Sequence, residues 1–239
     1  MAENRDSKRI RERLALQLPV RIHCRESRDS QWTEMTRLMN VTPFGAAFTL
    51  TRPTERGRLL HMTIPMPRQL RVFDHVEDQY KIWAIVRHLK SKTTDKGPAF
   101  EVGVAFIGKT APASYETQPW TCYEVSFSAD DKLARVHERQ QRRPDDPRAH
   151  TRHPMAVEML LEMIDPDGRV GSSEQTVTEN ISAQGATLFT TLEIPVGRFI
   201  RVTSDQYRTT AYAAIRSRTT GADGIARIHV EFVDKQWPL

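Results

Sequence analysis

The chain has 239 residues, of which 38% are hydrophobic and 27% charged, enough apolar material for one large or two small packed domains. No stretch approaches 18 uncharged apolar residues, and the start, charged through residue 13, lacks the apolar region of a signal peptide, so no membrane span and a cytoplasmic location are expected. The formal net charge is +5, and only eight of the 35 Lys and Arg residues are lysines, which favours an anionic partner.

Apolar residues come in short runs with the length and composition of β-strands. In the first half these runs are 19–24, 45–50, 59–64, 80–89 and 100–107, and in the second half 156–164, 185–190, 198–203, 210–217 and 226–233. Residues typical of turns separate them at 95–98, 165–168 and 221–224. Many short strands at such spacing predict an all-β barrel or sandwich.

The segment 109–147 departs from this pattern. Ser128 and the acidic residues after it are typical of a helix start, and Pro144 of a helix end. We therefore expect a polar helix over 130–143, followed by a linker that ends at 147. The expected domains are 1–127, 128–147 for the helix and linker, and 148–239.

The two halves repeat with a period near 140 residues. Each begins with two arginines four residues apart: Arg9 and Arg13 in the first half, Arg148 and Arg152 in the second. About 28 residues later each carries an Asn-x-Ser/Thr-x-x-Gly motif between strands: Asn40, Thr42 and Gly45, then Asn180, Ser182 and Gly185. The closing strands also match, VGVAFI in one half and IHVEFV in the other. The first copy has roughly 14 additional residues, which we place in a loop around 65–79.

The arginine pair, the Asn-Ser-Gly motif and the closing strand together resemble the PilZ domain, the bacterial receptor module for cyclic di-GMP. The resemblance covers about 9–108 and 148–234. It implies two tandem six-stranded antiparallel β-barrels joined by the polar helix and linker. The second copy matches the family pattern in full, whereas the first has Thr42 where the pattern has Ser. The second copy is therefore the better expected site.

The resemblance implies that the ten motif residues of both copies bind cyclic di-GMP. Arginine can bind the paired acceptors of guanine bidentately, stack on a purine or bind a phosphate. The Asn amide and the Ser or Thr hydroxyl can meet the polar edge of the base. Glycine permits either a left-handed backbone or a close approach that a Cβ would block. Each residue also has a purely structural interpretation, in which the Asn amide caps a bend and the Gly is needed only for a backbone conformation with positive φ.

Three classes of function remain to be distinguished. The first is a cyclic di-GMP receptor whose ligand orders the arginine arm and the linker, changes the arrangement of the barrels and acts on a downstream protein. The second is a ligand-independent scaffold or dimerisation module. Nucleic-acid binding is not favoured, because Trp83 and the phenylalanines lie in apolar strand patterns and are expected in the core: Phe100, Phe106, Phe189, Phe199 and Phe232.

An enzyme is not expected either. The sequence has no phosphate-binding loop, no GxSxG nucleophile motif and no dinucleotide fingerprint. Cys24 and Cys122 are far apart and predict neither a metal site nor a disulfide framework. The sequence thus predicts no metal and no cofactor, and cyclic di-GMP is the one expected ligand.

Overall fold

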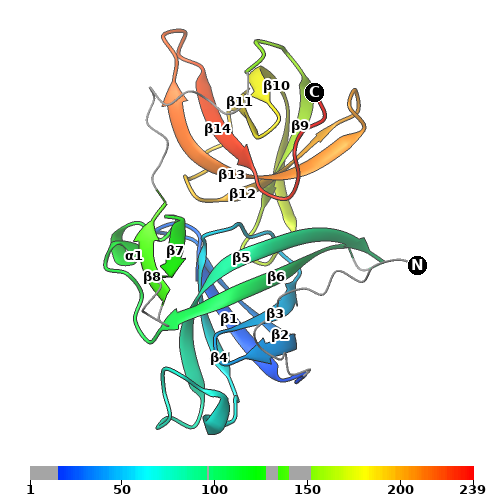
Figure 1. The fold of residues 1–239 in the computed structure, drawn as a ribbon. Helices are drawn as coiled ribbons and strands as arrows, with labels where there is room; N and C mark the ends of the chain where they lie inside the picture. The colour runs from blue at the N-terminus through cyan, green and yellow to red at the C-terminus, as the bar shows by residue number, and fades with distance from the viewer. Residues whose placement is uncertain (1–15, 96, 128–133, 140–151) are drawn as a thin grey trace, which may run out of the picture.

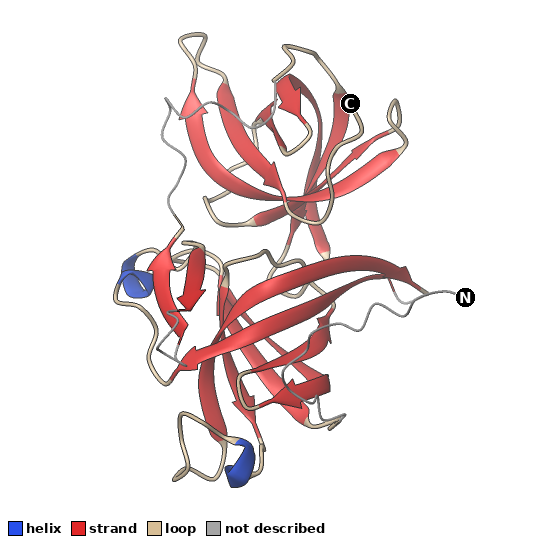
Figure 2. Cartoon of the chain, viewed as in Figure 1, coloured by secondary structure: helices blue, strands red, loops and turns tan. Residues whose placement is uncertain are grey.

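The structure, a computed structural model, describes residues 16–95, 97–127, 134–139 and 152–239. Within them the chain is almost entirely β-structure (Figure 2). The strands form two closed six-stranded antiparallel barrels and one two-stranded sheet (Figure 1). The two tandem barrels expected from the sequence are confirmed.

The first barrel is built from strands β1 to β6 in the order β1-β2-β3-β6-β5-β4. Their bounds are Pro19–Arg25, Gln31–Thr42, Gly45–Leu50, Leu59–Ile64, Tyr80–Thr94 and Gly97–Gly108. Alternate side chains point inward, as the strand period of two requires, and fill the barrel with aliphatic and aromatic residues. The fully buried ones include Val20, Ile22, Phe48, Met62, Ile82 and Phe100.

The second barrel has the same order of equivalent strands, β9-β10-β11-β14-β13-β12. Their bounds are Glu158–Ile164, Val170–Ser182, Gly185–Phe189, Phe199–Ser204, Thr209–Thr220 and Ala226–Phe232. Two irregularities recur at equivalent places. Pairing shifts just before Asn40 in β2 and just before Asn180 in β10, and again between Val86 and His88 in β5 and between Ile215 and Ser217 in β13. The internal repeat thus extends to the bulges.

The long insertion also lies where the sequence placed it. Residues 65–79, which include the short 3-10 helix η1 (Arg68–Leu70), connect β4 to β5, whereas 205–208 make the equivalent connection from β12 to β13. The expected aromatic core is largely confirmed: Phe100, Phe106, Phe199 and Phe232 are buried. Trp83 and Phe189 are half-buried.

The expected helix over 130–143 is wrong where the structure describes it. Ala134–Glu138 forms strand β8, which pairs antiparallel with β7 (Tyr123–Phe127); the rest of the helix prediction lies outside the described residues. Tyr123 and Val125 of β7, with Val136 of β8, pack on Leu59 of the first barrel. The alternation of Val136 with polar neighbours therefore fits a strand with one buried face, and this packing overrides the local helix signals.

The helix α1 (Ser114–Thr117) belongs to the same small apolar cluster. Its Tyr115 is buried and packs edge-on against Trp83 at 4.8 Å between ring centroids. No helix in the described part of the chain has the length and hydrophobicity that crossing a membrane requires.

The two barrels meet through buried charged groups. Glu55, in the β3–β4 connection, accepts hydrogen bonds from Arg58 at 2.5 Å and from Arg216 of the second barrel at 3.1 Å. Arg58 also donates to the carbonyl of Gly197, in the second barrel, at 3.4 Å. Burial is the largest single influence on Glu55 and raises its pKa, but the attractions of Arg216 and Arg58 and the hydrogen bonds to the carboxylate together outweigh it and hold that pKa at about 2. Glu55 is therefore a fully ionised bridge between the barrels at neutral pH.

Two further contacts extend this interface. Glu26, from the β1–β2 connection, pairs with Arg198 at 3.4 Å, and both side chains are buried. Phe100 of β6 packs edge-on against Tyr212 of β13, with 4.9 Å between ring centroids. The ribbon formed by β5 and β6 lies along this boundary (Figure 1).

Candidate ligand-binding site

The structure places the Asn, Ser or Thr, and Gly of each motif around one tight hairpin. Asn40 and Thr42 lie in β2 and Gly45 begins β3; Asn180 and Ser182 lie in β10, with Gly185 beginning β11. The motif is thus the end of one strand and the start of the next, and its expected location between strands was wrong. Strands β2 and β10 were missed because most of their side chains are polar or exposed.

The arginine pairs are only partly described. Arg152 lies before β9 on the exposed surface, close enough to His229 for its charge to act on that ring. Arg9, Arg13 and Arg148 lie outside the described residues. Their expected part in ligand binding stays a prediction.

The hydroxyl of each motif stabilises the hairpin turn in the same way. Thr42 Oγ1 donates to the carbonyl of Gly45 at 3.3 Å and accepts from the amide of Phe44 at 3.2 Å. Ser182 Oγ donates to the carbonyl of Gly185 at 3.1 Å and accepts from the amide of Gln184 at 3.4 Å. The proton of each hydroxyl is therefore used within the turn, and Thr42 reproduces the geometry of Ser.

The motif glycines are required by close approach of the backbone. A Cβ on Gly45 would lie 2.2 Å from the carbonyl oxygen of Val104, and a Cβ on Gly185 would lie 2.2 Å from that of Val230. Neither glycine has a positive φ. Of the two expected reasons for glycine, close approach is confirmed and the left-handed backbone is wrong.

In the second barrel the motif asparagine is engaged by neighbouring strands. Thr187 Oγ1, in β11, lies 3.2 Å from Asn180 Oδ1 and 3.0 Å from His229 Nδ1 in β14. The threonine hydroxyl donates to the amide oxygen, so it accepts from an Nδ1–H of the imidazole. Burial, and to a lesser extent the charge of Arg152, lowers the pKa of His229. The ring is therefore neutral at neutral pH and completes a three-residue network.

In the first barrel the same positions are open. Ala47 stands where the second barrel has Thr187, and Gly103 where it has His229. Asn40 makes no side-chain hydrogen bond among the described residues. A hollow of about 690 Å³ lies over the motif, and its walls include Asn40, Thr42, Gly45, Ala47, His88 and Gly103. We call it the first-barrel hollow.

The rim of the first-barrel hollow is basic. Arg56 from the β3–β4 connection and Arg87 and Lys90 from β5 line it, and Glu101 is the one carboxylate that the described residues contribute. Glu101 forms an ion pair with Lys92, so its charge is compensated. The hollow therefore combines apolar walls, a free amide and an excess of positive charge, which suits a ligand with flat polar rings and negative groups.

The sequence motif did not indicate the residues that open the hollow. None of Arg56, Arg87 and His88 belongs to a motif. Arg56 reaches the rim from the β3–β4 connection, and Arg87 and His88 reach it from the shifted pairing in β5. One signal was present: the matching closing strands differ at Gly103 and His229, glycine in one copy and histidine in the other. A residue-by-residue comparison of the copies would have marked this position as the site of divergence.

The sequence matches no family model and no curated protein. Among solved structures it is similar to that of the Bacillus subtilis inhibitor of motility, MotI/DgrA, at 10% identity over 93% of this chain and 90% of that chain, with a TM-score of 0.31. Borreliella burgdorferi PlzA in complex with c-di-GMP is 9% identical, with 94% and 84% covered and a TM-score of 0.29. Escherichia coli YcgR in complex with c-di-GMP is 13% identical, with 91% and 76% covered and a TM-score of 0.29. TM-scores this low add nothing to the fold, which rests on the strand pairings above.

Proposed function

We propose that the chain is a tandem PilZ protein and a receptor for cyclic di-GMP. The observation that carries the proposal is the first-barrel hollow, which lies directly over the motif residues Asn40, Thr42 and Gly45. Its volume of about 690 Å³ is in the range of small-molecule sites. The sequence resemblance and the repeated barrel supply the rest of the support.

The role of each group follows from the chemistry of a cyclic dinucleotide, which carries two guanines and two phosphates. The Asn40 amide can pair with the polar edge of a guanine, and Gly103 leaves room for a ring. The arginine pairs Arg9–Arg13 and Arg148–Arg152 then grip guanine and phosphate as bidentate donors. The protein itself performs no reaction on the ligand; it is a receptor in the cytoplasm, not an enzyme.

Signalling requires that binding change another part of the molecule. Arg148 and Arg152 lie in sequence between the barrels, so a ligand that engages them orders the arm and the linker and changes how the barrels face each other. The readout is contact with a downstream protein. X-ray scattering with and without saturating cyclic di-GMP tests this part: superimposable profiles would contradict the rearrangement and leave binding intact.

A ligand-independent scaffold is the second candidate. One observation favours it: in the second barrel Asn180, Ser182 and Gly185 are all used within the protein, as the Thr187 contact and the turn show. Such a barrel is complete without a ligand. In this alternative the ion pair between Glu55 and Arg216, with the hydrogen bond from Arg58 to Gly197, makes the chain one rigid interaction module.

Calorimetric titration of the whole chain with cyclic di-GMP separates the two candidates. The receptor hypothesis predicts saturable binding of cyclic di-GMP that weakens in Asn40→Ala. Titration with cyclic di-AMP is the control for guanine preference. Asn180→Ala is the matched substitution in the other copy. Absence of heat with folded wild-type protein would contradict the receptor and favour the scaffold.

A further inference from the structure

Three cations at the first-barrel hollow have no carboxylate partner among the described residues. Arg56 lies in the β3–β4 connection, and Arg87 and Lys90 lie in β5. Arg87 makes one long hydrogen bond, to the carbonyl of Val125 at 3.5 Å, and none of the three forms an ion pair within that part of the chain. Their charges repel one another across a shared space, and an anion placed there would relieve that repulsion.

The equivalent surface of the second barrel is neutralised from within. Arg216, which stands at the same β-bulge as Arg87, is bound by Glu55 and by Glu231 at 2.9 Å. Arg218 donates to Glu193 at 2.9 Å. Here the protein's own carboxylates already bind both guanidiniums.

Arg227 of β14 shows the same compensation. It binds Asp223 at 2.7 Å and Glu179 at 2.8 Å, and its guanidinium lies over the Phe189 ring at 4.7 Å. The corresponding residue of the first barrel is Glu101 of β6. The cation on this strand is therefore already fully engaged, and the ring that could stack on a base is covered.

Arg56 and Arg87 also border a second hollow of about 380 Å³, next to the first, whose lining includes Tyr123, Val125 and Arg139 and one carboxylate, Glu124. The two guanidiniums thus stand between the two hollows and are accessible from both. Each can offer two parallel N–H donors, the geometry that matches a phosphate.

We propose that Arg56 and Arg87 bind the phosphates of a cyclic dinucleotide, with Lys90 beside them, and that the first barrel is the ligand site while the second barrel is closed. The inference rests on the proposed function. It reverses the expectation from the motif alone, which favoured the second copy because its motif is complete. The reason is that motif residues shape the hairpin in both barrels, whereas in the described part of the chain the first barrel has a hollow over its motif asparagine and cations without carboxylate partners, and the motif asparagine of the second barrel is bound by Thr187.

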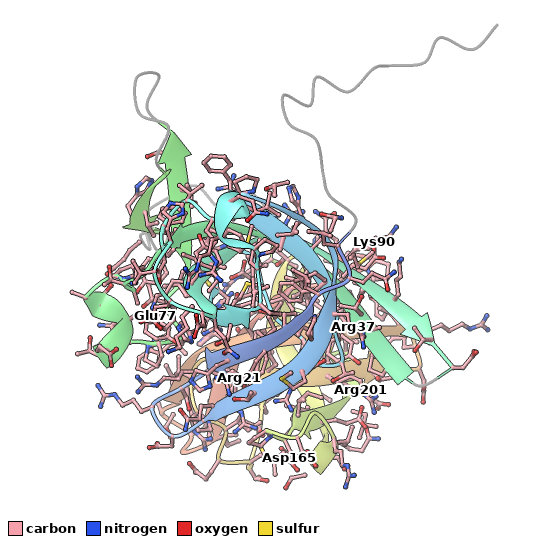
Figure 3. All side chains as sticks on the ribbon, turned by 90° about the horizontal axis from the view of Figure 1, so that it is seen from below. Arg21, Arg37, Glu77, Lys90, Asp165 and Arg201 are labelled. Atoms are coloured by element: carbon pink, nitrogen blue, oxygen red, sulfur yellow. The ribbon has the colours of Figure 1, made fainter. Side chains whose placement is uncertain are left out.

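The test is calorimetric titration of the full chain with cyclic di-GMP. We compare wild type with Arg56→Gln/Arg87→Gln and with a control pair in the same barrel, Arg21→Gln/Lys81→Gln, which removes the same charge. Arg21 lies in β1, away from Lys90 (Figure 3), and does not line the hollow. A charge-assisted hydrogen bond to phosphate corresponds to roughly tenfold or more in affinity, so we expect a loss of about 100-fold in the first pair and less than about threefold in the control.

A third variant, Asn180→Ala/His229→Ala, removes two members of the network over the second-barrel motif and should keep wild-type affinity and a stoichiometry of one site. If this variant lost binding while Arg56→Gln/Arg87→Gln kept it, the assignment to the first barrel would be overturned and the receptor function would stand. If folded wild type showed no binding at all, the receptor function and the assignment would both be overturned. Circular dichroism and thermal unfolding of each variant confirm that loss of binding is not loss of fold.

Discussion

The first and second barrels have the same strand order, the same two bulges and the same backbone contact at the motif glycine, but they use the surface over the motif differently. In the first barrel Ala47 and Gly103 leave a hollow with a basic rim. In the second, Thr187 and His229 fill the equivalent place and bind the motif asparagine. The difference lies in two side chains opposite the motif and not in the motif.

This comparison shows what the motif itself does. The hydroxyl closes the hairpin turn in both barrels, and the glycine allows the hairpin to lie against the next strand. These are requirements of the fold, so a complete motif indicates a well-formed hairpin whether or not a ligand binds. The residues that face it from β3 and β6, or from β11 and β14, decide whether space remains.

The largest expected effect concerns Glu55. This carboxylate compensates the charge of Arg216, whereas the equivalent bulge residue Arg87 has no carboxylate partner among the described residues. Glu55→Gln removes the charge that compensates Arg216 and Arg58 in a buried place. Breaking such a pair from one side costs about 3–5 kcal/mol of unfolding free energy. Chemical denaturation measures it. Glu193→Gln is the control. The Glu193 side chain, which pairs with Arg218, is 90% exposed, so we expect the unfolding free energy to change by no more than about 0.5 kcal/mol.

The same carboxylate predicts a pH dependence. The pKa of Glu55 is held at about 2 in the folded protein, below the ordinary value of about 4.3 for the unfolded chain. The contribution of the ionised Glu55 to the free energy of unfolding is therefore fully present above about pH 5 and is lost as the pH falls toward 2. The difference in unfolding free energy between wild type and Glu55→Gln should shrink over that range. An unchanged difference at pH 3 would contradict the ionised bridge.

The next prediction converts the first barrel into a copy of the second. Ala47→Thr/Gly103→His places side chains in the first-barrel hollow; Gly103 has ordinary space, since the nearest atoms that a Cβ there would meet belong to the His88 side chain, at 3.4 Å or more. We expect cyclic di-GMP affinity to fall by about 100-fold, or roughly 2.7 kcal/mol. Calorimetry measures it, with thermal unfolding as the check on folding. The reciprocal variant Thr187→Ala/His229→Ala should bind as wild type does, and a loss of binding there would place the ligand in the second barrel.

The smallest effect concerns the one difference between the motifs. Thr42→Ser should change the unfolding free energy by less than about 0.5 kcal/mol, because both hydroxyls make the same two hydrogen bonds in the turn. Thr42→Val, which keeps the shape and removes the hydroxyl, should cost about 1 kcal/mol. Thermal unfolding distinguishes them. A large gain in ligand affinity in Thr42→Ser would show instead that the extra methyl group obstructs the ligand.

Most strands could be predicted because their inward residues are apolar and their turns contain glycine or aspartate. Strands β2 and β10 could not, since each is largely polar and is held by pairing with its neighbours. The hairpin of β7 and β8 was missed for a related reason: Val136 reveals a buried face only once the first barrel supplies the surface it packs on. Local helix signals at 128–131 then dominated the interpretation.

The sequence indicated the motif residues of the candidate site but not the groups around them. The repeat singled out Asn40, Thr42 and Gly45, and the structure brings these three together on the β2–β3 hairpin rather than between strands. Arg56 and Arg87 reach the same hollow from other parts of the chain, through a connection and a bulge that spacing alone does not indicate. Whether a cation is compensated also depends on partners far away in sequence, as for Arg216 and Glu55.

Glu55 and Arg56 are neighbours in the chain, yet one is buried against the second barrel and the other lies on the first-barrel hollow. Any displacement of this short connection therefore moves Glu55 at the contact between the barrels and Arg56 at the hollow together. A ligand that repositions Arg56 therefore alters the free energy of contact between the barrels. By thermodynamic reciprocity, whatever loosens or tightens that contact alters ligand affinity by the same factor. The peptide bond between these two residues is the shortest route by which an occupied hollow could be sensed elsewhere in the molecule.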